Sequence, residues 1–158
     1  MFGELSPAEI EEVLQQQVVG RLGCHADGQT YVVPISYAYD GKYVYGHTNE
    51  GMKISMMRKN PAVCFEVDVL HDMALWKSVI VWGAFEELTT EPERHQGLEV
   101  LYTRILPMIS SDTTKLSSEW PFTPSNMDAI KGIVYRVRLL KKTGRFENNT
   151  PLPFPGWG

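Results

Sequence analysis

A polar segment after a strand-like run carries the residues of this chain that could do chemistry. His47 and Thr48 follow the run Lys42–Gly46, and Lys53 comes shortly afterwards, where an amphipathic segment begins. A helix start offers unpaired N–H groups and the positive end of the helix dipole. A lysine placed there adds a full positive charge, so the segment is suited to binding a phosphate. His47 and Thr48 add hydrogen-bonding groups. The same pattern is also typical of an ordinary surface turn with a solvated lysine.

Other signatures of chemistry are absent from the sequence. It contains no GxGxxG or GxxxxGK[ST] loop, so a nucleotide-like cofactor would not be bound by those loops. It also contains no CxxC pair and no metal-ligand spacing. Cys24 and Cys64 each lie in an apolar run. We expect reduced core residues of a cytoplasmic protein, while a disulfide between them stays open.

Composition narrows the class of protein. The chain has 158 residues, a net charge of −4, 43% hydrophobic and 22% charged residues. These values indicate one soluble domain, expected over residues 1–146, with a Pro- and Gly-rich extended tail over 147–158. No apolar run of about 18 residues and no secretory signal are present, so we expect no membrane segment and a cytoplasmic location. Basic residues are scattered, which argues against nucleic-acid binding.

The hydrophobic pattern predicts a mainly β fold with a few helices. One helix is expected from the capping box at Ser6, one from Lys53 to Asn60, and one from Thr90 to Pro107. Asp27-Gly28 and Asp40-Gly41 are turn signals that would join the first three strands into an antiparallel meander. Short antiparallel strands with few helices predict a small barrel. The expected strands are Val19–His25, Thr30–Tyr39, Lys42–Gly46, Ala62–Leu70, Trp76–Leu88, with a bend at Gly83, and Gly132–Leu140, which Lys141–Phe146 continues or ends.

Several segments, taken in order, resemble a known family. They are Gly20–Gly23, Tyr31–Ser36, Tyr43–His47 with Lys53 after it, Asn60-Pro61 with Val63–Val67, Trp76–Gly83 and Thr143–Arg145. This set resembles the FMN-binding split β-barrel proteins, and within them the pyridoxamine phosphate oxidase-related group that includes nitroimidazole-resistance proteins. The resemblance implies a six-stranded antiparallel split β-barrel.

The resemblance also implies a cofactor, FMN, and the residues that bind it. The strand Val33–Ser36 would run along the flavin ring, the end of the next strand would lie beside the ribityl phosphate, and Lys53 would bind the phosphate. Ser78 would lie near the flavin, with Lys77 within reach of the phosphate. The expected cofactor-binding residues are Val33, Pro34, Ile35, Ser36, Gly46, His47, Thr48, Lys53, Lys77 and Ser78.

The same resemblance implies a homodimer with the flavin in the groove between subunits. Trp120 or Phe122 of a second subunit could then cover the ring, while Trp76 and Trp82 are better suited to the core or the dimer interface. There are departures from the phosphate oxidase: Met52 stands where that enzyme has a basic residue, and Ser78 stands where it has an amide. These departures argue against pyridoxamine phosphate oxidation but not against flavin binding.

The residues also allow plainer interpretations. Val33-Pro34-Ile35 could be an ordinary edge strand, since proline interrupts ladder pairing. His47 could be a surface histidine or, with a pKa near neutrality, a proton carrier. No catalytic residue is assigned, because a flavin would carry the electrons.

Three functions follow from the sequence. The first is an FMN-dependent oxidoreductase acting on a small aromatic or nitro compound. The second is a non-catalytic dimeric sensor or storage protein that binds flavin, haem or a deazaflavin. The third is a barrel without a cofactor that serves only as a dimeric interaction domain.

Overall fold

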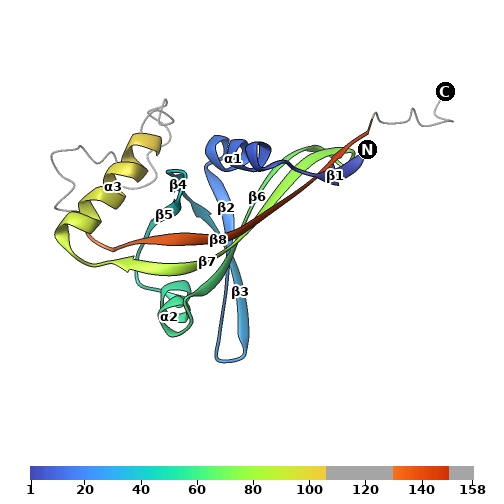
Figure 1. The fold of residues 1–158 in the computed structure, drawn as a ribbon. Coiled ribbons are helices and arrows are strands. Elements are labelled where there is room, and N and C mark those ends of the chain that lie inside the picture. The colour runs from blue at the N-terminus through green and yellow to red at the C-terminus, as the bar shows by residue number, and fades with distance from the viewer. Residues whose placement is uncertain (106–129, 150–158) are drawn as a thin grey trace, which may run out of the picture.

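The fold is taken from a computed structural model, which describes residues 1–105 and 130–149. The expected ring-covering residues, Trp120 and Phe122, lie outside the described part of the chain, as does most of the expected tail. The helices are α1 (Pro7–Gln16), α2 (Met52–Lys59) and α3 (Glu91–Ile105). The strands are β1 (Phe2–Glu4), β2 (Val19–Ala26), β3 (Gln29–Ser36), β4 (Ala38–Tyr39), β5 (Tyr43–Thr48), β6 (Ala62–Asp72), β7 (Leu75–Leu88) and β8 (Ile133–Asn148) (Figure 1).

One antiparallel sheet contains all the described strands, in the order β3-β2-β6-β7-β8-β5-β4, with β1 paired to β8. The end strands β3 and β4 are separated in sequence only by Tyr37. The sheet therefore has to curl until its two edges approach each other, although they do not pair. This geometry confirms the split-barrel prediction. The sheet has eight strands rather than six, because β1 is a short added strand of three residues and the predicted strand Thr30–Tyr39 divides into β3 and the two-residue β4.

The expected three-stranded meander is wrong. The segment Thr30–Tyr39 was predicted as one strand, but β3 ends at Ser36 and pairs with β2, whereas β4 pairs with β5. Tyr37 marks the break, because its N–H donates to Val18 O and its hydroxyl donates to Leu14 O. These two hydrogen bonds hold the fully buried tyrosine against α1 and the segment after it. At this residue the chain passes from β3 at one edge of the sheet to β4 at the other edge.

Local signals at two other places are confirmed. Asp27 and Gly28 both have positive φ angles, 52° and 75°, as a two-residue hairpin turn requires. At the start of α1 the Ser6 hydroxyl accepts from Glu9 N–H, and the Glu9 carboxylate accepts from Ser6 N–H. The helix then buries Ile10, Val13 and Leu14 against the sheet.

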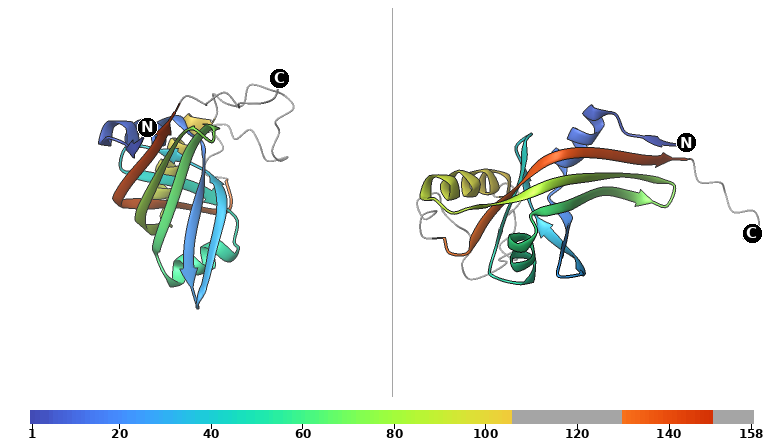
Figure 2. Two further views of the ribbon diagram at one scale, coloured as in Figure 1. Left: turned by 90° about the vertical axis from the view of Figure 1, so that its right-hand side faces the viewer. Right: turned by 60° about the horizontal axis from the view of Figure 1, so that its bottom comes forward.

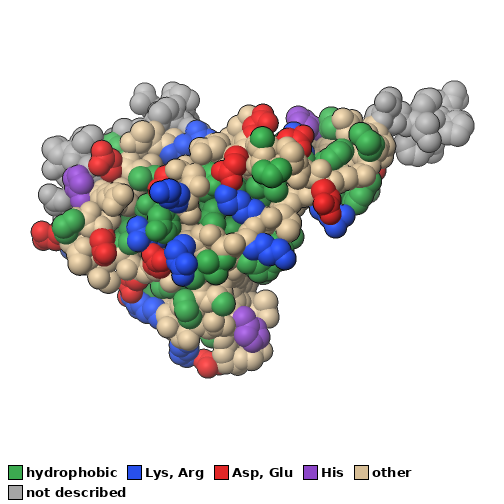
Figure 3. Space-filling model, viewed as in Figure 1, with side chains coloured by type: hydrophobic (Ala, Val, Ile, Leu, Met, Phe, Trp, Pro, Cys, Tyr) green, Lys and Arg blue, Asp and Glu red, His purple; other side chains and the backbone are tan. Residues whose placement is uncertain are grey.

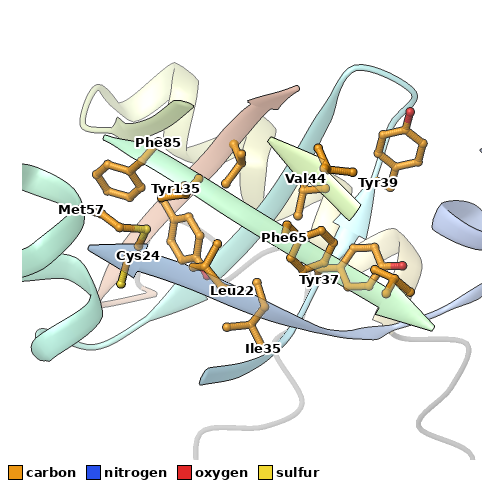
Figure 4. Close-up of a cluster of buried hydrophobic side chains, with 14 of the residues drawn as sticks. Leu22, Cys24, Ile35, Tyr37, Tyr39, Val44, Met57, Phe65, Phe85 and Tyr135 are labelled. Atoms are coloured by element: carbon orange, nitrogen blue, oxygen red, sulfur yellow. The ribbon is translucent and has the colours of Figure 1, made fainter. Parts of the chain in front are cut away.

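The main core fills the inside of the curled sheet (Figure 4). Leu22, Phe65 and Tyr135 project into it from different strands, and α2 adds Met57. A second cluster lies under α3, where Leu98 and Leu101 pack with Tyr45, Leu88 and Val134. Because these apolar contacts hold α3 against β5, β7 and β8, the helix becomes a fixed wall at one end of the barrel.

Strands β6, β7 and β8 extend far beyond the barrel, away from α3 (Figure 2). The β7–β8 ladder shifts register between Trp82 and Gly83, where Trp82 faces Lys141 and Gly83 faces Leu139. A side chain at Gly83 would lie 2.5 Å from Arg138 O, so the two strands come close only because this residue is glycine. The bend predicted at Gly83 thus coincides with a β-bulge.

The two cysteines are free. Cys64 pairs with Gly23 across β2 and β6, which places the neighbouring Cys24 side chain on the opposite face of the sheet. Cys24 is buried while Cys64 is partly exposed. Because the two side chains lie on opposite faces of the sheet, they do not form the disulfide left open from sequence. In the described residues, no helix is long and apolar enough to cross a membrane.

Candidate functional site

A cavity of about 320 Å³ lies between the end of β3, the end of β5, the start of α2 and the inner face of α3. Its volume is in the range of small-molecule sites. Its described lining residues are Pro34, Ile35, Ser36, His47, Lys53, Leu98, Leu101, Tyr102, Ile105, Ile130 and Tyr135. Polar groups from β3, β5 and α2 meet apolar groups from α3 in this one space.

Lys53 is the principal charged group of the cavity. Its Nζ donates to Thr48 Oγ1 at 2.8 Å, and the Thr48 hydroxyl in turn donates to Asn49 O. Among the described residues no carboxylate forms an ion pair with Lys53. Burial lowers the pKa of its ammonium, partly offset by the nearby Cys24 thiol. A partly desolvated cation without an anionic neighbour favours binding of an anionic ligand.

The start of α2 adds donors beside this lysine. Lys53 is the second residue of the helix, and no side chain caps the helix at Gly51. The first-turn N–H groups of a helix have no intrahelical partners and carry the positive end of its dipole. Arg58 and Lys59 lie in the last turn, where they complement the opposite end of that dipole. Lys53 and the uncapped start of α2 therefore lie together, as the sequence predicts, while anion binding by them stays a prediction.

His47 and Thr48 belong to the end of β5, rather than to a turn after it, and pair with Val134 and Ile133. His47 Nε2 donates to Lys131 O at 2.7 Å, which fixes the orientation of its ring at the cavity wall. Gly132, with φ of +97°, lies against this ring: an added Cβ would lie 2.9 Å from His47 Nε2 and 2.8 Å from Thr48 O.

The part of the cavity wall that α3 contributes is apolar. Leu98, Leu101, Tyr102 and Ile105 come from one face of α3, as their spacing requires. Ile130 continues this wall. The sequence identified the α3 residues as an apolar helical face, but their role as cavity lining could not be separated from an ordinary core role, since both produce the same periodicity.

Seven of the ten expected cofactor-binding residues lie in or around this cavity. Five line it, namely Pro34, Ile35, Ser36, His47 and Lys53. Thr48 holds Lys53, and Gly46 lies against Tyr135, whose ring would be 2.4 Å from an added Cβ. Val33 instead points toward the core, against which it packs.

Lys77 and Ser78 are not brought to the cavity of the same chain. Both lie on β7, where Ser78 Oγ donates to Glu66 Oε1 at 3.1 Å. Burial raises the pKa of Glu66, with the Ser78 hydrogen bond opposing that effect. Arg21 adds an ion pair to Asp68 at 3.0 Å on the same sheet face. Ser78 therefore belongs to a separate polar cluster, whereas Lys77, the residue before it on β7, projects from the opposite face of the sheet.

The family of the chain follows from its sequence. A family model described as pyridoxamine 5'-phosphate oxidase matches residues 6–145. The chain belongs to this family. Its match to the uncharacterised protein RA0666 of Rhizobium meliloti (strain 1021) is 38% identical over 84 residues, spanning 53% of this chain and 56% of that protein.

Solved structures share the fold of this chain. A FAD-binding protein from Mesorhizobium loti is 31% identical, with a TM-score of 0.73, covering 94% of this chain and 99% of that one. A FAD-binding protein from Mycobacterium smegmatis is 24% identical, with a TM-score of 0.65, covering 93% and 100%. A candidate 5-nitroimidazole antibiotic resistance protein from Bacteroides thetaiotaomicron is 18% identical, with a TM-score of 0.68, covering 92% and 87%.

Proposed function

We propose that this chain is a cytoplasmic, homodimeric flavoprotein that binds FMN without a covalent bond and reduces a small aromatic or nitro compound. The observation that carries the proposal is Lys53. It lines the cavity at the uncapped start of α2, and it has no carboxylate partner in the described residues. A flavin phosphate supplies the missing negative charge.

The residues around Lys53 fit such a group. The ammonium has three N–H donors, of which one is used by Thr48 within the described part of the chain. Together with the first-turn N–H groups of α2, it can donate several charge-assisted hydrogen bonds to a phosphate. Ser36 and the backbone near Pro34 provide polar contacts for the ring edge. A bound flavin would supply the electron or hydride transfer, while the chain binds, orients and shields it.

The second subunit is part of this proposal. Pro34 lines the cavity, and Val32 lies on the same outward face of β3 beside an apolar groove that includes Cys64, Trp82 and Leu140. Figure 3 shows hydrophobic side chains mixed with lysine and arginine side chains over β7 and β8. A second copy docked on this face would bring its own β7 toward the cavity mouth. Ser78, which shares the outward face of β7 with Trp82, would then lie close to the flavin across the interface.

The test of flavin binding is an absorption spectrum of the purified protein, taken before and after adding FMN and removing the excess. We expect retained flavin in the unaltered protein and at least about tenfold weaker retention in Lys53→Ala, because one charge-assisted contact is lost. Lys59→Ala is the matched control, since Lys59 ends the same helix and pairs with Asp27 at 2.6 Å. Equal retention by both variants would contradict the role of Lys53.

The same preparation separates related cofactors and functions. FAD is a second candidate, favoured by the FAD-binding relative from Mesorhizobium loti, and chromatography of the released flavin distinguishes it from FMN. Bleaching of the bound flavin by NAD(P)H, followed by reoxidation with a nitro compound, supports an oxidoreductase. Bound flavin that no donor reduces supports a sensor or storage protein, and a Soret band would indicate haem.

A further inference from the structure

The proposed function does not specify which substrates the apolar part of the cavity would accept. We infer that the α3 face formed by Leu98, Leu101, Tyr102 and Ile105 is the specificity-determining surface, and that it selects an uncharged, apolar substrate. This inference rests on the proposed function, since it assigns the Lys53 end of the cavity to the phosphate of the cofactor. It excludes a phosphorylated substrate from the same space.

The first argument is the distribution of charge in the cavity. Among its described lining residues, Lys53 is the only lysine, arginine, aspartate or glutamate. Once the cofactor phosphate is paired with Lys53, a second anion would have no described cation beside it. Burying an unpaired anion against aliphatic side chains costs far more free energy than burying a neutral ring.

The second argument concerns the arginines of α3, which could otherwise have served a second anion. Arg94 donates to Gly132 O and to Ile130 O, both at 2.9 Å. Arg104 donates to the carbonyls of Gln15 and Gln16, at 2.8 and 3.0 Å. Neither arginine lines the cavity. Both guanidinium groups hold the helix in place by binding backbone carbonyls.

The third argument is the burial of the wall itself. Leu98, Leu101 and Tyr102 are 6%, 5% and 8% exposed. Leu98 and Leu101 are fixed by packing in the cluster beneath α3, and so they form a preorganised surface. The opposite face of the helix, with Glu99, Thr103 and Arg104, lines a separate groove beside β4. The polar and apolar faces of α3 are therefore separated, and only the apolar face meets the cavity.

The test compares two nitroarenes that differ by one para carboxylate group, neutral nitrobenzene and anionic 4-nitrobenzoate. Calorimetry measures the dissociation constant of each, on flavin-loaded protein and on protein stripped of flavin. We expect nitrobenzene to bind at least about tenfold more tightly than 4-nitrobenzoate to the loaded protein. Equal binding, tighter binding of the anion, or no binding of either would overturn the inference.

Variants on the two faces of α3 test whether its apolar face causes the preference for an uncharged ligand. Ile105→Lys places a cation in the apolar part of the cavity and is expected to strengthen 4-nitrobenzoate binding by about tenfold. Thr103→Lys, which adds the same charge on the other face, is the matched control and should change neither constant. If both lysines act alike, the α3 face is not the determinant.

A second variant serves if Ile105→Lys does not fold. Leu101→Ala leaves the charge unchanged and enlarges the apolar part of the cavity, so nitrobenzene binding should weaken while 4-tert-butylnitrobenzene binding strengthens. Unchanged relative affinities would overturn the inference. Flavin retention is measured separately for each variant, so loss of the cofactor, which contradicts the proposed function, is distinguished from loss of the ligand preference.

Discussion

Gly132 and Gly41 adopt nearly the same backbone conformation in different surroundings. Their φ angles are +97° and +96°, yet nothing lies within 4 Å of a Cβ built at Gly41, whereas a Cβ at Gly132 would meet Thr48 O and the His47 ring. Gly132 therefore meets two requirements at once, a backbone angle and a close approach to the cavity wall.

This pair provides a prediction on stability. Gly41→Ala should lower the free energy of unfolding by about 1–2 kcal/mol, because only the unfavourable angle is added. Gly132→Ala should lower it by more, since the contact at 2.8 Å is with backbone and cannot be relieved by a rotamer change. Urea denaturation of both variants measures the difference. Equal losses would show that the loop before β8 shifts to accommodate the methyl group.

At the same scale, the sequence was informative where a residue acts through its neighbours in the chain. Lys53 could be identified as an anion-binding candidate because its charge and the helix start lie in one segment. The separation of Ser78 from the cavity was not predictable, because it depends on the pairing of β7 with β6 and on Glu66, which accepts the Ser78 hydrogen bond.

Among the elements, α3 has the most direct influence on the cavity. Arg104, near the end of the helix, donates to the last carbonyls of α1, Gln15 O and Gln16 O. This contact joins two helices that lie far apart in sequence, and it anchors the end of α3 that carries Tyr102 and Ile105.

Removal of this anchor should loosen one end of the helix. Arg104→Ala is expected to lower the free energy of unfolding by about 1.5–3 kcal/mol, the usual range for hydrogen bonds to a charged group. Hydrogen exchange should accelerate more over the second half of α3 than over β7. Thr103→Ala, which removes an exposed neighbour, should leave exchange unchanged. Acceleration spread evenly over all elements would mean that Arg104 supports the whole fold rather than the wall.

Element boundaries followed from the sequence where local signals decide them. The capping box at Ser6 and the Asp27-Gly28 turn fixed one helix start and one hairpin. The break between β3 and β4 had no such signal, since strand-forming residues continue through Tyr37. The break arises because Tyr37 forms hydrogen bonds with the carbonyls of Leu14 and Val18. These are tertiary contacts, which the periodicity of the sequence does not encode.

For the whole molecule, the main expectation concerns the outer sheet face. Trp82 is 40% exposed and Leu140 is 62% exposed, and both line the same apolar groove. Large exposed apolar side chains gathered on one face commonly mark an interaction surface. The proposed homodimer would cover them.

The oligomeric state tests this expectation. Light scattering on the unaltered protein should give the mass of a dimer, and Trp82→Glu should raise its dissociation constant by at least about tenfold, since a charge replaces a buried aromatic. Flavin retention should fall with it if the groove holds the cofactor. Met73→Glu alters a side chain that is 91% exposed on the β6–β7 turn, and should have no effect. A monomeric unaltered protein would contradict the proposal.

The position of β8 in the sheet has a consequence for how the chain reaches its native state. β8 is the last described strand in sequence, yet it alone joins the block β3-β2-β6-β7 to the pair β5-β4. During synthesis, one edge of the 14-residue strand β7 stays unpaired until β8 has left the ribosome. Such long-range pairing slows folding, and in the meantime the unpaired edge of β7 can pair with strands of other chains and cause aggregation. Chains cut short before Ile133 would therefore be retained by chaperones or aggregate, rather than accumulate as a smaller folded barrel.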